Sequence, residues 1–246
     1  MVLMEELTSS ELREKRLQHD LLIPFGSIEA HGPHLPVGTD NIILTSVLRA
    51  LQGGAGLRNV LVSPMLTATP VNFVRCQGKD GELNPRLSPS IFGRYAFDVL
   101  SSFVHIYQPR SLLLVAWHDT PDFMGALRQL CNELKHETGV RNEILRVWIL
   151  ARRFAVSKGL VGEEERHAAK IETSLIQYLS PGLVKDEHRR NVAWTKAEHW
   201  GVDWSSFTEE GIFGNAADSS SEIGKLILDH VVSEATRLMA EFFARK

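Results

Sequence analysis

Short apolar runs alternate with helical patterns through the first 180 residues of the chain. The runs cover Leu21–Phe25, Val60–Val62, Leu112–Trp117 and Ile144–Leu150. They consist mostly of Val, Ile and Leu without polar alternation, as expected of strands that helices cover on both faces. We therefore predict an α/β fold, a three-layer α/β/α sandwich around a mostly parallel central sheet.

Between and after these runs, apolar residues recur at helical spacing. Proline at the first helical position and Ser, Thr or Asp before it are typical helix starts. The predicted helices begin near Thr39 and Asp40, at Pro89 after the N-cap Ser88, after Thr120 and Pro121, near His167 (ending at Leu179), and at a capping box Ser219–Glu222 (running to the C-terminus).

Two long segments, Met65–Leu87 and Pro181–Ala217, are rich in turn residues and lack periodicity. Loops of this length usually form lids, substrate walls or subunit contacts. The second contains Trp194, Trp200 and Trp204, for which we expect either a substrate wall or, preferably, an interface. No internal repeat or linker divides the chain, so we expect residues 1–246 to form a single domain.

Composition excludes several classes of protein. The chain carries 27 Lys+Arg against 30 Asp+Glu and no basic stripe, which argues against nucleic acid as a partner. Cys76 and Cys131 lack CxxC spacing, so they form neither a redox motif nor a thiolate zinc site. The N-terminus has no apolar signal region, and no apolar stretch approaches the ~20 residues of a membrane span. We expect a cytoplasmic protein without a membrane partner.

The strongest chemical signal is the segment GSIEAHGPHLPVGTD, residues 26–40, directly after the first strand. Glu29, His31 and Asp40 are good ligands for a divalent ion, and Glu29 and His31 project to the same side of an extended segment. Alternatively, the carboxylates cap helices and the histidines are solvated, but three ligand types together favour a metal site. His34 lies between prolines, and we expect a structural or substrate-facing role for it.

A second candidate follows the strand that ends at Trp117. Ligands of open parallel sheets bind outside the carboxyl ends of the strands, where His118 stands. The neighbouring Asp119 and Asp122 have a simpler explanation, since carboxylates at a helix N-terminus satisfy free amides. A histidine is a weaker cap, so we expect His118 to contact metal or substrate.

The third candidate is HAAKIETS, residues 167–174. His167 and Glu172 share a face only if His167 precedes the regular helical turns. Glu172 stands beside the core-facing Ile171 and Leu175, where a carboxylate needs a charged partner or a metal.

In this order and spacing, the three segments resemble the creatininase (creatinine amidohydrolase) family. Residues 26–40 look like the family's GSxEQHGPHLPLxTD, and HAAKIETS looks like its HAGxxETS. GIFGNAADSSSEIG, residues 211–224, is similar to a later family segment, GVxGDPxxAtxExG. The resemblance therefore extends from about residue 21 to 224.

The resemblance implies a dinuclear, metal-dependent hydrolase of amide-type bonds that assembles as a homo-oligomer, commonly a hexamer. By match, Glu29 and His118 would bind one metal, His31 and Glu172 the other, and Asp40 would bridge them. His167 would be the acid/base or substrate-orienting residue, and catalysis would fall to His167 and Glu172. Such ligands suit Zn²⁺, Mn²⁺ and Fe²⁺ alike.

Departures from the family surround these ligands. The chain reads WHDTP at 117–121 where the family has a Gly-rich GHGGN, Ala30 replaces Gln, and Asn215-Ala216 replaces Asp-Pro. Lys170 stands where many members are acidic. The ligands are thus kept while their surroundings change, as expected of a divergent member, and we name Asp119, Lys170 and His34 as candidate substrate contacts.

Two functions remain open at this stage. The first is an amidohydrolase that cleaves a C–N bond in a small cyclic amide, lactam or formamide; other ring opening, as of a lactone, would use the same centre. The alternative is a catalytically idle paralogue that binds a small molecule or serves in an assembly. An idle centre would have a fourth protein ligand, for which Asp119 is the candidate.

Overall fold

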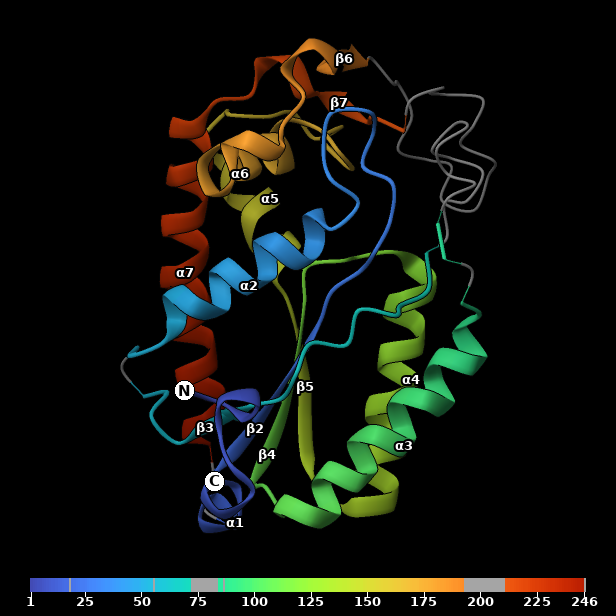
Figure 1. The fold of residues 1–246 in the computed structure, drawn as a ribbon, viewed down its shortest axis with the longest axis vertical. Coiled ribbons are helices and arrows are strands. Elements are labelled where there is room, and N and C mark those ends of the chain that lie inside the picture. Colours follow the sequence, from blue (N-terminus) through green and yellow to red (C-terminus); the bar gives the residue numbers. More distant parts are fainter. Residues whose placement is uncertain (18, 55, 72–83, 86, 193–210, 246) are drawn as a thin grey trace.

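Parallel strands form the central sheet in the computed structural model of the chain (Figure 1). The structure describes residues 1–246 except 18, 55, 72–83, 86, 193–210 and 246. Within these residues the sheet has five strands in the order β1-β3-β2-β4-β5, all parallel. Their bounds are Val2–Leu3 (β1), Asp20–Phe25 (β2), Val60–Val62 (β3), Ser111–Ala116 (β4) and Arg141–Arg146 (β5). A separate antiparallel pair joins β6 (Asn191–Val192) and β7 (Gly214–Asn215).

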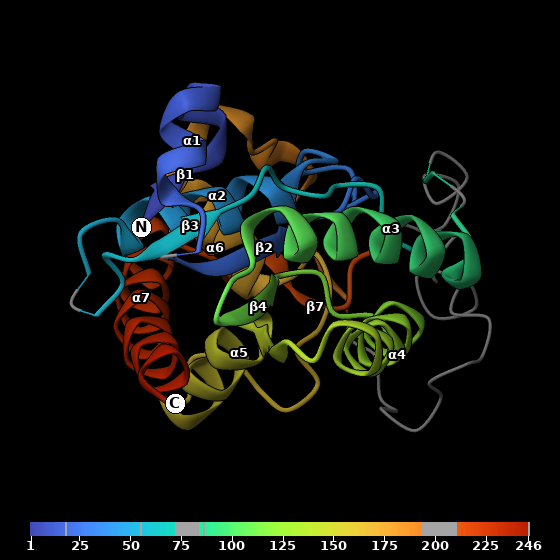
Figure 2. The same ribbon diagram turned by 90° about the horizontal axis from the view of Figure 1, so that it is seen from below.

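Helices cover both faces of this sheet (Figure 2). One face carries the helices α2 (Thr39–Leu51), α5 (Val147–Ser157), α6 (Lys170–Leu179) and α7 (Ser221–Ala244). The other carries α1 (Ser9–Lys15), α3 (Pro89–Tyr107) and α4 (Pro121–Thr138). Every residue of β2 and β4 is buried between the two layers, which explains why both strands are apolar after their first residue. The predicted three-layer α/β/α sandwich is therefore confirmed.

The prediction of a strand over Ile144–Leu150 is wrong at both ends. The strand β5 already begins at Arg141, and the helix α5 begins at Val147. This strand lies at the edge of the sheet and is half-exposed, so its first residues are polar. The apolar run continues into α5 because that helix buries Val147, Ala151 and Ala155, four residues apart, on the sheet.

The predicted helix starts are close to those observed. Ser88 caps α3 by accepting a hydrogen bond from the Ile91 N–H. The last helix is capped by Ser220, one residue later than predicted. The helix α6 begins at Lys170, so His167 precedes its regular turns.

The N-terminal elements were not predicted from the sequence. Residues Val2–Leu3 add β1 to the free side of β3, and α1 follows. Thr8 and Glu11 form a capping box at the start of α1, a signal that is legible in the sequence. Two predictions lie outside the described residues, namely those for Cys76 and for the group of Trp194, Trp200 and Trp204.

The topology brings two strand ends together at one edge of the sheet. From β2 the chain runs through α2 to β3 on one side, whereas from the neighbouring β4 it runs through α4 to β5 on the other side. Neighbouring strands whose connections diverge in this way mark the ligand-binding edge of open α/β sheets. Residues after Phe25 and after Ala116 therefore meet there. Among the described residues, none of the helices has the length and apolar composition to cross a membrane.

Candidate metal centre

The loop after β2 brings Glu29 and His31 to this edge. A Cβ atom on Gly26 would lie 1.8 Å from the side-chain oxygen of Asn41 in α2, so any larger residue here would displace the Asn41 side chain. The Glu29 N–H donates to the Val37 carbonyl at 3.0 Å, which closes the loop. Both Glu29 and His31 are buried.

Two helix N-termini supply two further carboxylates. Asp40 is the second residue of α2, and Glu172 is the third residue of α6. The partial positive charge of a helix N-terminus favours a carboxylate in the first turn. Glu172 Oε2 accepts a hydrogen bond from the Ala168 N–H at 2.6 Å, and Glu172 Oε1 accepts one from the Trp117 indole at 2.9 Å.

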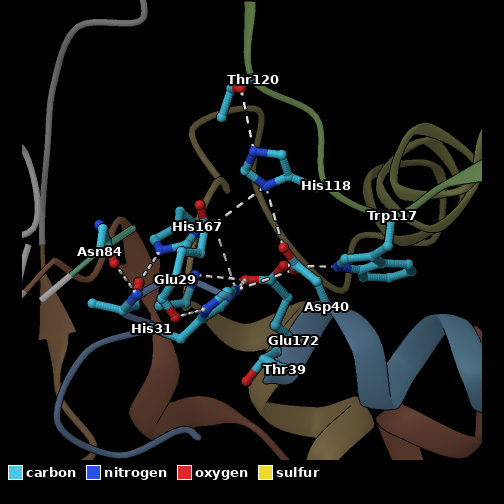
Figure 3. Close-up of polar contacts among 12 residues, drawn as sticks. Glu29, His31, Thr39, Asp40, Asn84, Trp117, His118, Thr120, His167 and Glu172 are labelled. Atoms are coloured by element: carbon cyan, nitrogen blue, oxygen red, sulfur yellow. Dashed lines mark hydrogen bonds and ion pairs between the residues drawn. The ribbon is translucent and has the colours of Figure 1, made fainter. Parts of the chain in front are cut away.

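His118 follows β4 and turns its Nδ1 atom toward the carboxylates (Figure 3). Its Nε2 atom lies 3.0 Å from the Pro70 carbonyl oxygen, which can only accept, so Nε2 carries the proton. Nδ1 is then left for a metal ion or a second proton, and it lies 3.2 Å from Asp40 Oδ2 and 3.4 Å from Glu29 Oε1. An imidazole anchored in this way by a backbone carbonyl is the usual arrangement of a metal ligand.

His31 is held in the same manner. Its Nδ1 atom lies 3.1 Å from the Glu29 carbonyl oxygen and donates to it, which leaves Nε2 for a metal ion or a second proton. This Nε2 atom is 3.3 Å from Asp40 Oδ1 and 3.8 Å from Glu172 Oε2. The two oxygens of Asp40 thus face different histidines, Oδ1 toward His31 and Oδ2 toward His118 (Figure 3).

His167 lies beside this cluster and is partly accessible. The next residue, Ala168, has a φ of 52°, a left-handed turn that separates His167 from α6. The Nε2 atom of His167 donates to the Ala30 carbonyl at 2.8 Å, and its Nδ1 atom lies 3.4 Å from Glu29 Oε1. Its ring packs on that of His31 with centroids 4.3 Å apart.

These side chains fit divalent metal ions. Ligand atoms lie within 4.8 Å of one another in three groups: Glu29, Asp40 and His118; His31, Asp40 and Glu172; and Glu29, His31 and His167. The buried atoms Glu29 Oε2, His31 Nε2 and Asp40 Oδ2 have no hydrogen-bond partner in the described part of the chain. Buried polar atoms normally have partners, and imidazole with carboxylate is a donor set that suits Zn²⁺, Mn²⁺ or Fe²⁺.

The electrostatics of the cluster lead to the same conclusion. Burial disfavours a charged imidazole, but Asp40, Glu172 and Glu29 outweigh it and raise the pKa of His31 to about 10. The pKa of His118 is also raised, against its burial, by Glu29 and Asp40. Despite burial, the histidines hold the pKa of Asp40 well below its usual range. The carboxylates therefore require positive charge, from protons or from metal ions.

A pocket opens onto the cluster. Including the open solvent at its mouth it holds about 550 Å³. Besides carboxylates and imidazoles of the cluster, Trp148, Arg166 and Phe213 line it. Glu29, Asp40, His118, His167 and Glu172 all line the pocket.

The three candidate substrate contacts have different positions. Asp119 lines the pocket, with its carboxylate bound by the Arg146 guanidinium at 2.8 and 3.1 Å. His34 is fully buried, and its Nε2 atom lies 2.9 Å from the Thr173 hydroxyl. Lys170 is the first residue of α6, and neither it nor His34 lines the pocket. The burial of His34 and its contact with Thr173 fit the structural role, the other of the two roles expected for it.

The explanation of Asp119 as a helix cap is wrong. The helix α4 has Thr120 at its N-cap position, and the Asp119 carboxylate accepts hydrogen bonds from Arg146 of β5 instead. This partner comes from the neighbouring strand, 27 residues away, so nothing near Asp119 in the sequence indicates it.

Several residues around the cluster were missed from the sequence. Glu165 is buried and accepts the Ile171 N–H at 2.8 Å, but it ends an acidic run that resembles a solvated segment. Asn84 is buried and accepts the Ala30 N–H through Oδ1. The hydrogen bond from Trp117 to Glu172 could have been predicted from the sequence. A buried indole N–H requires an acceptor, and the carboxylate of Glu172 requires a partner.

Comparisons with known proteins agree with this geometry. Residues 5–239 match the family described as "Creatininase: Creatinine amidohydrolase". A manganese form of creatininase is 22% identical, with a TM-score of 0.80 and 99% of each chain covered. A creatinine amidohydrolase (creatininase) is 22% identical, with a TM-score of 0.80 and 100% of this chain and 99% of that one covered. A mutant creatininase of Zn–Zn type is 21% identical, with a TM-score of 0.77 and 99% and 98% covered. At this identity these structures show the same fold. None of the curated protein sequences matches the chain.

Proposed function

The chain belongs to the creatininase family of metal-dependent amidohydrolases, and we propose that it cleaves a C–N amide bond of a small cyclic amide, lactam or formamide at a dinuclear centre. One observation carries the proposal. Buried carboxylates and imidazoles converge beside an open pocket, with their free ligand atoms directed at one another. Such a cluster has no evident structural purpose, because burying carboxylates without cations is costly.

The same distances support an assignment of ligands. Glu29 and His118 would hold one ion, and His31 and Glu172 the other. Asp40 would serve both, since each of its oxygens faces a different histidine. The ions would be Zn²⁺, Mn²⁺ or Fe²⁺; the structural relatives include forms with manganese and with zinc.

When bound, ions of this kind lower the pKa of water and polarise a carbonyl oxygen. The proton removed from water requires a carrier, and His167 is placed for this role because it lines the pocket. Its Nε2–H is committed to the Ala30 carbonyl, so Nδ1 is the atom that takes up a proton. Glu29 Oε1, 3.4 Å from this Nδ1, would stabilise the imidazolium until the proton passes to the leaving nitrogen. Glu172 would contribute to catalysis as a ligand.

The alternative of an idle subunit has less support. An idle subunit would have a fourth protein ligand at the centre, with Asp119 as the candidate. The Asp119 carboxylate is bound instead by Arg146, and Asp119 belongs to none of the ligand groups among the described residues. We therefore retain the hydrolase as the proposed function.

The decisive experiment is a hydrolysis screen of the metal-loaded protein against cyclic amides, formamides and lactams. Asp40→Ala serves as the blank. We expect about two ions per chain by elemental analysis and turnover of at least one of these classes. A protein that stays free of metal after loading, or a metal-loaded protein inactive on all three classes, would refute the proposal.

The organisation of the protein belongs to the same proposal. We expect one domain over residues 1–246, a homo-oligomer such as a hexamer, and a cytoplasmic location. The family match over residues 5–239 supports the first of these.

A further inference from the structure

Trp117 connects the hydrophobic core to the candidate metal centre. It directly follows β4 and its side chain is 1% exposed. Its ring packs in the core and meets the Trp148 ring edge-on, with centroids 5.6 Å apart. Its indole N–H donates to Glu172 Oε1 at 2.9 Å (Figure 3). A rigid core residue is therefore bound to one candidate ligand.

Two donors determine the orientation of the Glu172 carboxylate. The Trp117 indole binds Oε1, and the Ala168 N–H binds Oε2 at 2.6 Å. It is Oε2 that faces His31 Nε2, at 3.8 Å. With Oε1 held by the indole, the carboxylate cannot rotate about its terminal bond without losing a charge-assisted hydrogen bond.

We propose that Trp117 is a positioning residue for the metal group of His31, Asp40 and Glu172. Its indole N–H holds Glu172 with Oε2 directed at His31 and thereby sets the metal affinity of that group. Partners of metal ligands typically change affinity by 10–100-fold when they are removed. The inference rests on the proposed metal centre, but it does not depend on which bond the enzyme cleaves.

The effect of Trp117 should be confined to one group. The group of Glu29, Asp40 and His118 shares only Asp40 with it and contains no atom bonded to the indole. The neighbouring His118 is oriented independently by the Pro70 carbonyl. Removing the indole N–H should therefore weaken one of two binding steps and spare the other. A general loss of packing would weaken both.

The test is a calorimetric titration of the metal-free protein with Zn²⁺, comparing the wild type with Trp117→Phe. We expect one binding step to weaken about 10–100-fold and the other to change by less than about 3-fold. The matched control is Trp148→Phe, which alters the same aromatic contact but leaves the indole of Trp117 on Glu172. This control should bind Zn²⁺ at both steps as the wild type does.

A second variant separates the hydrogen bond from the shape of the ring. Site-specific replacement of Trp117 by benzothienylalanine keeps the bicyclic side chain and exchanges the N–H for sulfur. We expect the same one-step loss of Zn²⁺ affinity, and a smaller rise in Tm on adding Zn²⁺ than in the wild type. This variant decides the matter if Trp117→Phe does not fold.

The possible outcomes are distinct. Unchanged Zn²⁺ affinities in both variants, or equal weakening of both steps, would overturn the role of Trp117 alone. Failure of the wild type to bind any of Zn²⁺, Mn²⁺ and Fe²⁺ would overturn this inference and the proposed function together. If the Trp117 variants lose affinity at one step only and the metal-loaded wild type hydrolyses no amide, the inference is supported and the proposed function is refuted.

Discussion

Asp40 Oδ1 lies 3.3 Å from His31 Nε2, in a site where both side chains are almost completely buried. The second oxygen of Asp40 faces His118 at 3.2 Å. One carboxylate in the first turn of α2 therefore stands between two imidazoles that are each anchored through their other nitrogen. The proposed centre depends more on this residue than on any other.

Replacing Asp40 by Asn should abolish binding of both ions, because both candidate groups contain its carboxylate. We expect the metal content to fall from about two ions per chain to nearly none, measured by elemental analysis after dialysis. The control is Asp122→Asn, since Asp122 is also the second residue of a helix but is exposed. Retention of full metal content by Asp40→Asn would contradict the ligand assignment.

Replacing His167 by Ala should separate proton transfer from metal binding. We expect the metal content to be retained and turnover to fall by about 100-fold or more, as for loss of a general acid/base. Elemental analysis and the rate on the best substrate of the screen measure the two effects. Loss of an ion would instead make His167 a ligand, as its group with Glu29 and His31 would allow. Normal turnover would assign it a purely structural role.

Glu165 should make stability depend on pH. Burial raises the pKa of this carboxyl to about 7, against an ordinary value of 4.5. The folded protein thus holds a proton that the unfolded chain loses first, so this contribution to stability is complete below pH 4.5 and is lost as the pH rises toward 7.

Glu165→Gln keeps an acceptor for the Ile171 N–H and removes the titration. We expect the variant to match the wild type near pH 4.5 and to be more stable at pH 8, by on the order of 3 kcal/mol. Urea unfolding of the metal-free proteins at the two pH values measures this difference. The exposed neighbour Glu164→Gln is the control. An equal difference at both pH values would show that folding does not raise the pKa of Glu165.

Gly224 should tolerate no side chain, because the contact between α6 and α7 requires a bare backbone. A Cβ atom there would lie 1.9 Å from the Ser174 carbonyl oxygen. We expect Gly224→Ala to lower the free energy of unfolding by about 3 kcal/mol or more, as overpacking against backbone does. Gly93→Ala in α3, where a Cβ meets nothing within 4 Å, should raise it by about 0.5–1 kcal/mol. Similar effects of the two substitutions in urea unfolding would contradict this packing.

Local patterns in the sequence were sufficient for the class of fold and for the segments that hold the candidate centre. Continuous apolar runs identified β2 and β4, because helices cover both faces of these strands. Placing ligands at the carboxyl ends of strands then required only the rule for open parallel sheets. The helical spacing also required His167 to precede the regular turns of α6 if it was to share a face with Glu172. The left-handed backbone at Ala168 places His167 before these turns.

Only the tertiary structure decided the partners of these residues. Asp119 meets Arg146 and His34 meets Thr173, and the members of these pairs lie 27 and 139 residues apart. Trp117 and Glu172 also come from distant parts of the chain, although each residue by itself indicates that a partner is needed. Sequence patterns report which face of an element is buried. Which polar groups meet in the buried space depends on how strands and helices from distant parts of the chain pack together.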